Sequence, residues 1–357
     1  MINRHSPILI VLLAGLLFAA CGSGSKEKEN PDDFRIITDM AGREVKIPNE
    51  IGSAFIDRHS VFLLYALDTV ISVNKVFQYN ESEKKYLKKS FYENKPYAIE
   101  DAREEILRLN PDVVLYSQPI TDDAIEKVDL LQKTVNTPVL LMDIRVDKYK
   151  DALVFLGEVL HKREKAAELR NFIETRVEPV VKKAKSISPG QRKRIYYAEG
   201  MNGLQTDPSG SIHSYLFDLL GAINVAEADI LPGKGMTGVS PEQVYHWNPD
   251  MIIVWSGNFD GLNSYKYIRT HKTWSLLDAV KRGEVYQVPW RPFGWIDRPP
   301  GLNRLIGIIW LSKILYPDVF SDDIVPVVQE FFEKFYHYSL TEEEAKDIMN
   351  PFPVIHD

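Results

Sequence analysis

A distinctive pattern of polar and hydrophobic residues occurs twice in this chain, once from Glu104 and once from Glu242. Each copy carries an aliphatic residue two positions after the Glu and Asn-Pro-Asp at six to eight positions after it, and then runs into an aliphatic stretch. A helix must stop before the Pro, and a continuous aliphatic stretch is typical of a buried parallel strand. The copies start 242 − 104 = 138 residues apart, much further than solenoid repeats do. The pattern therefore predicts two similar α/β lobes with a cleft between them.

Between the two copies, apolar residues recur every three or four positions from Asp147 to about Ser186. This spacing predicts one long helix, which at about 1.5 Å per residue would span roughly 50 Å and reach along both lobes. Pro179 predicts a kink or an early end, and two helices separated by a break are the alternative. We accordingly divide the chain into an N-terminal lobe at 34–147, a linking helix at 148–187 and a C-terminal lobe at 188–357.

Alternating short apolar runs and amphipathic segments predict the elements of each lobe. We expect a hairpin at 35–45 and strands at 51–56, 70–73, 113–116, 138–142, 194–197, 252–255 and 285–288. Helices are expected at 61–67, 213–220, 302–315 and 326–338.

The N-terminus reads as a secretory signal, because its first twenty residues carry one fixed charge, Arg4, and an apolar run too short to span a bilayer comfortably. Cys21 is the only cysteine and follows two alanines, as in a lipoprotein cleavage box, although Phe18 stands where Leu is usual. We expect a lipoprotein signal at 1–20, lipidation of Cys21 and a flexible tether at 21–33, with a plain cleaved signal as the alternative. The protein should then be exported and anchored to the membrane, in the periplasm or at the cell surface.

Charge and motif content exclude several classes of function. The formal net charge is −7, and loss of the one basic residue in the signal gives −7 − 1 = −8, with no basic stripe that would suit nucleic acid. The sequence has no Gly-x-Ser-x-Gly motif, no P-loop and no spaced carboxylate pair typical of glycosidases, so we do not expect an enzyme. The eight His show no HxH or HExxH spacing, which argues against a zinc-type cage.

Three further stretches carry a family resemblance together with the repeated pattern: 218–226 (Asp-Leu-Leu-Gly-Ala-Ile-Asn-Val-Ala), 303–311 and 315–318. The chain resembles the substrate-binding proteins of ABC importers for iron complexes and vitamin B12 from about residue 34 to 326. The resemblance implies an α/β fold of two Rossmann-like lobes joined by a single long helix, with the ligand cleft between the lobes. It also implies a monomer that works with an ABC permease and its ATPase. In that family the Glu that begins each copy pairs with Arg residues of the permease, a role that would fall on Glu104 and Glu242. The alternative is that both are helix N-terminal residues favoured by the helix dipole.

Ligands of open α/β lobes sit beyond the carboxyl ends of the strands, which selects the candidate ligand-binding residues. Arginine beside aromatic rings suits a flat or anionic chelate, because guanidinium both stacks and pairs with oxygen anions. Structural roles are the alternatives, above all a rigid loop in which Trp295 packs on the lobe and Asp297 pairs with Arg298. The candidates are Arg58, His59, Tyr116, Trp255, Trp290, Arg291, Trp295 and Arg298.

These patterns together predict a receptor that captures a metal complex, first of all a ferric siderophore, and delivers it to an ABC permease. We expect no cofactor and select no metal-binding residues, because the expected ligand is a metal chelate. Direct coordination of that metal by protein groups stays open as an alternative. Other ligands stay open: molybdate or tungstate, haem, cobalamin or a nickel chelate. A ligand sensor or an adhesin is the alternative outside transport.

Overall fold

The computed structural model describes residues 33–57, 60–74, 77–93, 102–231, 233, 235–255 and 264–349. The predicted signal, most of the predicted tether including Cys21, and the candidates Arg58 and His59 lie outside these ranges. Within them, no helix is both long and apolar enough to cross a membrane.

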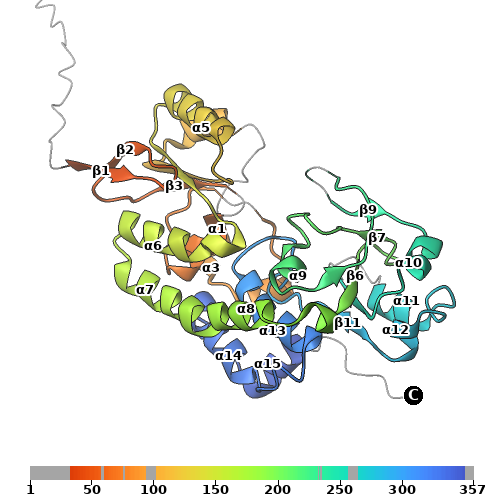
Figure 1. The fold of residues 1–357 in the computed structure, drawn as a ribbon. Coiled ribbons are helices and arrows are strands. Elements are labelled where there is room, and N and C mark those ends of the chain that lie inside the picture. Colours follow the sequence, from red (N-terminus) through yellow and green to blue (C-terminus); the bar gives the residue numbers. More distant parts are fainter. Residues whose placement is uncertain are drawn as a thin grey trace, which may run out of the picture.

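The N-terminal lobe, in which β3 is labelled in Figure 1, is built on a three-stranded parallel sheet. The strand order is β3-β4-β5. Its strands are β3 (Ala54–Ile56), β4 (Val113–Ser117) and β5 (Val139–Met142). They are almost wholly buried, as expected of short aliphatic runs in a parallel sheet. The hairpin β1 (Phe34–Thr38) and β2 (Glu44–Pro48) flanks the sheet. The strand predicted at 70–73 is reduced to one bridge, between Ser72 and Ala54.

The C-terminal lobe has a four-stranded parallel sheet of order β11-β10-β6-β8. Its strands are β6 (Arg194–Ala198), β8 (Ile223–Asn224), β10 (Met251–Val254) and β11 (Val285–Gln287). A small antiparallel pair, β7 (Gln205–Thr206) with β9 (Thr237–Gly238), lies beyond the end of β6. The mixed α/β architecture with two parallel sheets agrees with the fold class predicted from the sequence.

The repeated pattern forms the same local structure in both lobes. The first copy gives α4 (Arg103–Leu109) and then β4, and the second gives α10 (Pro241–Trp247) and then β10. Each helix ends at its Asn in the left-handed conformation, Asn110 with φ 45° and Asn248 with φ 41°, and the following Pro prevents continuation. Each Asp then accepts backbone N–H groups of a neighbouring segment, Asp112 from Gly52 and Asp250 from Arg194. The pattern is thus a helix-to-strand connection used twice.

The segment predicted as one long helix is broken, which corrects the prediction for 147–186. Helix α6 (Tyr149–Val159) ends at a Schellman turn, in which His161 has φ 54° and the Lys162 N–H donates to Gly157 O at 2.7 Å. The chain then forms α7 (Arg163–Phe172), a π-helical segment η3 (Ile173–Val177) and α8 (Glu178–Lys185) without interruption. Pro179 therefore neither ends the helix nor marks the break; it follows the π-helical segment in the first turn of α8.

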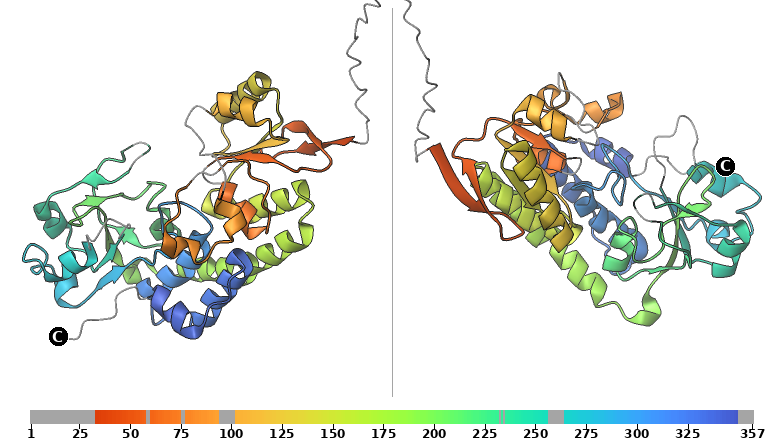
Figure 2. Two further views of the ribbon diagram at one scale, coloured as in Figure 1. Left: turned by 180° about the vertical axis from the view of Figure 1, so that it is seen from behind. Right: turned by 90° about the horizontal axis from the view of Figure 1, so that it is seen from above.

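The C-terminal helices return from the second lobe to the first (Figure 2). They are α13 (Asn303–Leu315), α14 (Val325–Phe331) with the π-helical segment η5 (Phe332–Tyr336), and α15 (Glu342–Met349). The Tyr65 hydroxyl of α1 (Ser60–Ala66) donates to Tyr336 O at 3.3 Å, and Lys85 pairs with Glu344 at 2.7 Å. The lobes are thus connected both by α7–α8 and by this C-terminal return.

The remaining elements are short or cover the sheets. They are α2 (Glu81–Lys84), α3 (Lys89–Tyr92), α5 (Asp122–Val135), η2 (Val146–Lys148), η4 (Pro189–Gln191), α9 (Tyr215–Leu219), α11 (Ser264–Thr270) and α12 (Asp278–Lys281).

Candidate ligand-binding site

The loop at 288–302 joins the two lobes at their strand ends. It leaves β11 in the C-terminal lobe, yet its Phe293 ring lies 5.0 Å from Phe62 and 6.1 Å from Tyr79 of the N-terminal lobe, between ring centroids. Gly301 fits against Phe62, where an added Cβ would come within 2.7 Å of the ring. The first residues of α13 hold the loop, since the Asn303 side chain donates to Phe293 O at 2.8 Å. Ligand-binding residues on this loop would therefore act where the lobes meet.

The loop places Arg298 among three fully buried carboxylates, which we call the Arg298 cluster: Glu199, Asp207, Asp297 and Arg298. The guanidinium donates to Asp207 at 2.6 Å and to Asp297 at 2.5 Å, and it also pairs with Glu199. The Trp255 ring centroid lies 5.7 Å from the guanidinium carbon. Arg298 is therefore fixed in one position, with only 17% of its side chain exposed.

Strand ends position the members of this cluster. Glu199 follows β6 and pairs through its backbone with Gln205, Asp207 follows β7, and Trp255 follows β10. Gly235 covers Asp207 and Arg298 closely with φ +62°, where a Cβ would lie 2.4 Å from the carboxylate. The site thus lies at the carboxyl ends of the C-terminal sheet, where open α/β lobes bind ligands.

Burial and ion pairing act in opposite directions on the charges of the cluster. Burial raises the pKa of Glu199 to about 9; Asp207 and Asp297 add to this and Arg298 opposes it. Burial alone would also raise the pKa of Asp207, but its hydrogen bonds, first of all the one from Arg298, outweigh burial, and the pKa is lowered. The acids hold the pKa of Arg298 above its usual value against its burial.

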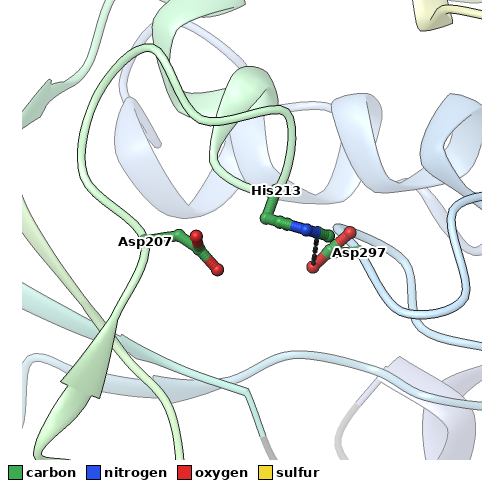
Figure 3. A group of neighbouring side chains, drawn as sticks. All are labelled: Asp207, His213 and Asp297. Atoms are coloured by element: carbon green, nitrogen blue, oxygen red, sulfur yellow. Dashed lines mark hydrogen bonds and ion pairs between the residues drawn. The ribbon is translucent and has the colours of Figure 1, made fainter. Parts of the chain in front are cut away.

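Asp207, His213 and Asp297 also come close enough to suggest a metal site (Figure 3). One ligand atom from each lies within 4.8 Å of the others, and His213 Nδ1 is 2.8 Å from Asp297 Oδ2. The guanidinium of Arg298, however, already bridges the same two carboxylates at 2.6 and 2.5 Å. A metal ion would have to displace this cation, so we assign no metal to the group.

Comparison with known proteins explains this arrangement of lobes. A family model described as "Periplasmic binding protein" matches residues 57–292. The chain belongs to this family. Proteins of the family bind small solutes and deliver them to an ABC permease, and they are not enzymes.

Individual members of the periplasmic binding protein family match over nearly the whole chain. The molybdate-binding protein MolA of Haemophilus influenzae is 27% identical, covering 95% of this chain and 98% of its own. Its molybdate-bound structure superposes with a TM-score of 0.63 at 28% identity, over 86% of this chain and 99% of that one. An ABC transporter solute-binding protein from Sulfurospirillum deleyianum reaches a TM-score of 0.79 at 28% identity, over 88% and 99%. The Bacillus subtilis triscatecholate siderophore-binding protein FeuA, at 16% identity and a TM-score of 0.53 over 81% and 99%, shares the fold.

In the N-terminal lobe of this periplasmic binding protein, Tyr116 is the one candidate residue that the structure describes. It is half-buried on β4, its hydroxyl accepts from Gln118 at 3.0 Å, and its pKa is raised by burial and then by Asp57. Asp57 itself fixes the turn into α1, since it accepts from Ser60 N at 2.9 Å and from the Ser117 hydroxyl. Tyr116 therefore lies at the predicted strand end.

The loop at 288–302 separates the candidates that the sequence grouped together. The guanidinium carbon of Arg291 lies 5.8 Å from the centroid of the Trp290 ring, and Arg291 pairs with Asp347 of α15 at 2.6 Å and not with the acids of the Arg298 cluster. Trp295 is 0% exposed and its indole N–H donates to Arg291 O, which agrees with the structural alternative in which Trp295 packs on the lobe. Trp255 and Arg298 come together in the Arg298 cluster, whereas Trp290 and Arg291 form a separate pair.

Besides Glu199, which directly follows a predicted strand, two residues of the site were not among the candidates selected from the sequence, Asp207 and His213. Both lie in the 207–214 loop, where the strand β7 is only two residues long and gives no periodic signal. The sequence Thr-Asp-Pro-Ser-Gly from 206 shows the turn, but nothing in it shows which residues the turn faces.

Proposed function

We propose that this protein is an extracytoplasmic solute-binding lipoprotein that captures a tetrahedral oxyanion, molybdate or tungstate, beside Arg298 and delivers it to an ABC permease. The observation that carries the proposal is the position of Arg298: one guanidinium held firmly, next to Trp255, on the loop where the lobes meet. The guanidinium already donates to Asp207 and Asp297, so an oxyanion would share or replace these partners; the fixed charge and planar shape of the guanidinium suit a small oxyanion. Similarity to MolA over 95% of the chain supports the same ligand class.

The ferric siderophore expected from the sequence is now the second candidate. Its main support was a dense group of aromatic rings and Arg at 290–298. In the structure, Arg291 forms an ion pair with Asp347 and Trp295 is buried, so fewer groups are available to stack on a flat chelate. Tyr116 at the strand end of the other lobe still offers a phenol to a ferric complex, so iron chelates belong in the test.

The test is a tryptophan-fluorescence titration of the chain from Gly22, with Trp255 as the reporter beside Arg298. Molybdate and tungstate should each change the fluorescence saturably. Arg298→Lys keeps the charge but loses the planar fork, so we expect at least about tenfold weaker binding. Arg291→Lys is the matched control and should bind like the wild type, because its partner Asp347 lies elsewhere.

The panel should also contain ferric catecholate, ferric hydroxamate and ferric citrate, haem, cobalamin and a nickel chelate. Binding of an iron chelate without molybdate or tungstate would make the oxyanion proposal wrong and the siderophore prediction right. No binding of any ligand would favour a sensor or an adhesin.

We also propose that Glu104 and Glu242 contact the permease and that Cys21 carries the lipid anchor. Both Glu are exposed in the first turn of matching helices, α4 and α10, and neither has a hydrogen bond or ion pair to another residue in the described ranges. Exposed carboxylates on separate lobes suit recognition and steering by a basic partner more than they suit a structural role.

A further inference from the structure

The Arg298 cluster has more acids than its cation can neutralise. Three carboxylates surround one guanidinium, so full ionisation gives a charge of −3 + 1 = −2 in a buried place. A dianion such as molybdate would meet this charge directly, because Arg298 is the group that we expect to bind it. Binding of an oxyanion beside Arg298 therefore requires some of this negative charge to be absent.

Glu199 is the member of the cluster whose surroundings least favour a charge. It is 0% exposed, and its Oε1 contacts Arg298. Its Oε2 is buried without a hydrogen-bond partner among the described residues. Oδ1 of Asp297 is also without one, but Asp297 contacts both His213 and Arg298, whereas within the described ranges the Glu199 carboxyl pairs with Arg298 alone. Ionised carboxylate oxygens in such places lack the donors that would replace water, and protonation is the usual outcome.

Among the described residues, the charged and titratable groups around Glu199 come from β6 itself, from the turn after β7 and from the 288–302 loop. Acids dominate, with one cation and two phenols whose own pKa values are raised by burial and by Glu199. His213 lies one step further out, on Asp297. The groups that face Glu199 are Tyr196, Tyr197, Asp207, Asp297 and Arg298.

We propose that Glu199 is held as an uncharged carboxylic acid in the binding-competent protein and that this neutrality sets which solute charge Arg298 accepts. The inference rests on the proposed function, since it concerns the charge of an anion bound beside Arg298. Glu199 acts through Arg298 and is thus a positioning residue for the cation, not a direct ligand. With Glu199 neutral, the cluster carries −2 + 1 = −1, and Arg298 is opposed by two carboxylates instead of three.

The test compares Glu199→Gln with the wild type, using molybdate as the probe and the chain from Gly22. Gln has nearly the shape of the neutral acid, so affinity at pH 7 should stay within about threefold of the wild type. As the pH rises through about 9, Glu199 ionises and the wild type should lose at least about tenfold in affinity, while Glu199→Gln should not. The matched control is Glu126→Gln, which makes the same change on an exposed face of α5 and should follow the wild type.

A second measurement needs no ligand. The folded pKa of Glu199 is raised from 4.5 to about 9, so between these values the folded state holds a proton that the unfolded state has lost. The contribution of Glu199 to the free energy of unfolding should then be largest at or below pH 4.5 and should be lost as the pH rises to about 9. Glu199→Gln should remove this contribution to the slope. Asp207→Asn, which takes away a neighbouring negative charge, should move the loss of stability to lower pH.

The outcomes separate the two proposals. If Glu199→Gln binds molybdate at least about tenfold more tightly than the wild type at pH 7, Glu199 is ionised in the wild type and the inference is wrong. The inference is also wrong if the free energy of unfolding depends on pH in the same way in Glu199→Gln and in the wild type. If neither protein binds molybdate but the slope is lost in Glu199→Gln, the oxyanion function is wrong and the role in solute charge falls with it, whereas the neutral state of Glu199 stands. If molybdate affinity falls with rising pH in the wild type but stays constant in Glu199→Gln, both the oxyanion function and the neutral state of Glu199 are supported.

Discussion

At the scale of single residues, Arg298 and Arg291 form ion pairs of very different kinds on the same loop. Arg298 balances acids that are 0% exposed, whereas Asp347, the partner of Arg291, is 56% exposed. Removing the cation from a buried group leaves its carboxylates uncompensated, and this costs much more than losing a surface pair. The environment of each Arg therefore decides its contribution to stability.

We predict that Arg298→Ala lowers the free energy of unfolding by about 3–5 kcal/mol, because two or three buried carboxylates lose their partner. Arg291→Ala is the control on the same loop and should cost no more than about 1 kcal/mol. Denaturant unfolding of both variants at pH 7 measures the difference. Equal losses would show that Arg298 is not the cation on which the buried acids depend.

Where strand ends were clear, the sequence placed candidate residues where the structure has them, and their contact with a ligand stays a prediction. Trp255 and Arg298 were both selected because aliphatic strands precede their segments, and the structure brings them within 5.7 Å. The alternative in which Asp297 pairs with Arg298 and Trp295 packs in the core is the one that the structure shows. The sequence could not show which arginine of the loop faces the Arg298 cluster and which faces α15. The loop turns between them, so that Arg291 pairs with Asp347 and Arg298 with Asp207.

At the scale of elements, the linking segment shows why hydrophobic spacing predicts that helices are present but not where they end. The three-and-four spacing continues through the turn at His161, because residues on both sides of the turn face the same core. The left-handed turn is made by a His, which gives no sequence signal of the kind that Gly or Asn gives. Pro179 gives a signal but is accommodated after the π-helical segment.

The close packing of α6 on α7 depends on Gly157, which leads to a second stability prediction. A Cβ at this position would lie 2.4 Å from the Cβ of Ala166 and 3.3 Å from Lys162 O. Gly157→Ala should therefore lower the free energy of unfolding by about 1–3 kcal/mol from overpacking, more than the gain of up to about 1 kcal/mol from helix propensity. Gly190→Ala, where a Cβ meets nothing within 4 Å, is the control and should change stability little. Thermal or urea unfolding measures both, and a stabilised Gly157→Ala would contradict the packing argument.

At the scale of the whole molecule, the two lobes are joined by helices on one side and by the 288–302 loop at the strand ends. The repeated pattern predicted the two lobes, because a buried parallel strand after a capped helix is a strong local signal. The C-terminal return onto the first lobe was not predicted, since its packing partners Tyr65 and Tyr336 are 271 residues apart. With two helical connections, we expect small lobe movements on binding rather than wide opening.

The two-lobe architecture also allows a direct test of the docking role proposed for Glu104 and Glu242. Glu104→Gln and Glu242→Gln, singly and together, should leave molybdate affinity unchanged, because both residues are exposed in the first turn of a helix and neither carboxylate contacts a member of the Arg298 cluster. Uptake through the cognate permease should fall in each single variant and fall further in the double variant, since each lobe would lose one contact to a basic surface. Glu105→Gln is the matched control on the same helix, because its carboxylate is already paired with Arg108 at 2.5 Å. Uptake by the double variant at the wild-type rate, with binding intact, would instead favour the structural role of these carboxylates at the helix N-termini, or a receptor that senses its ligand without transport.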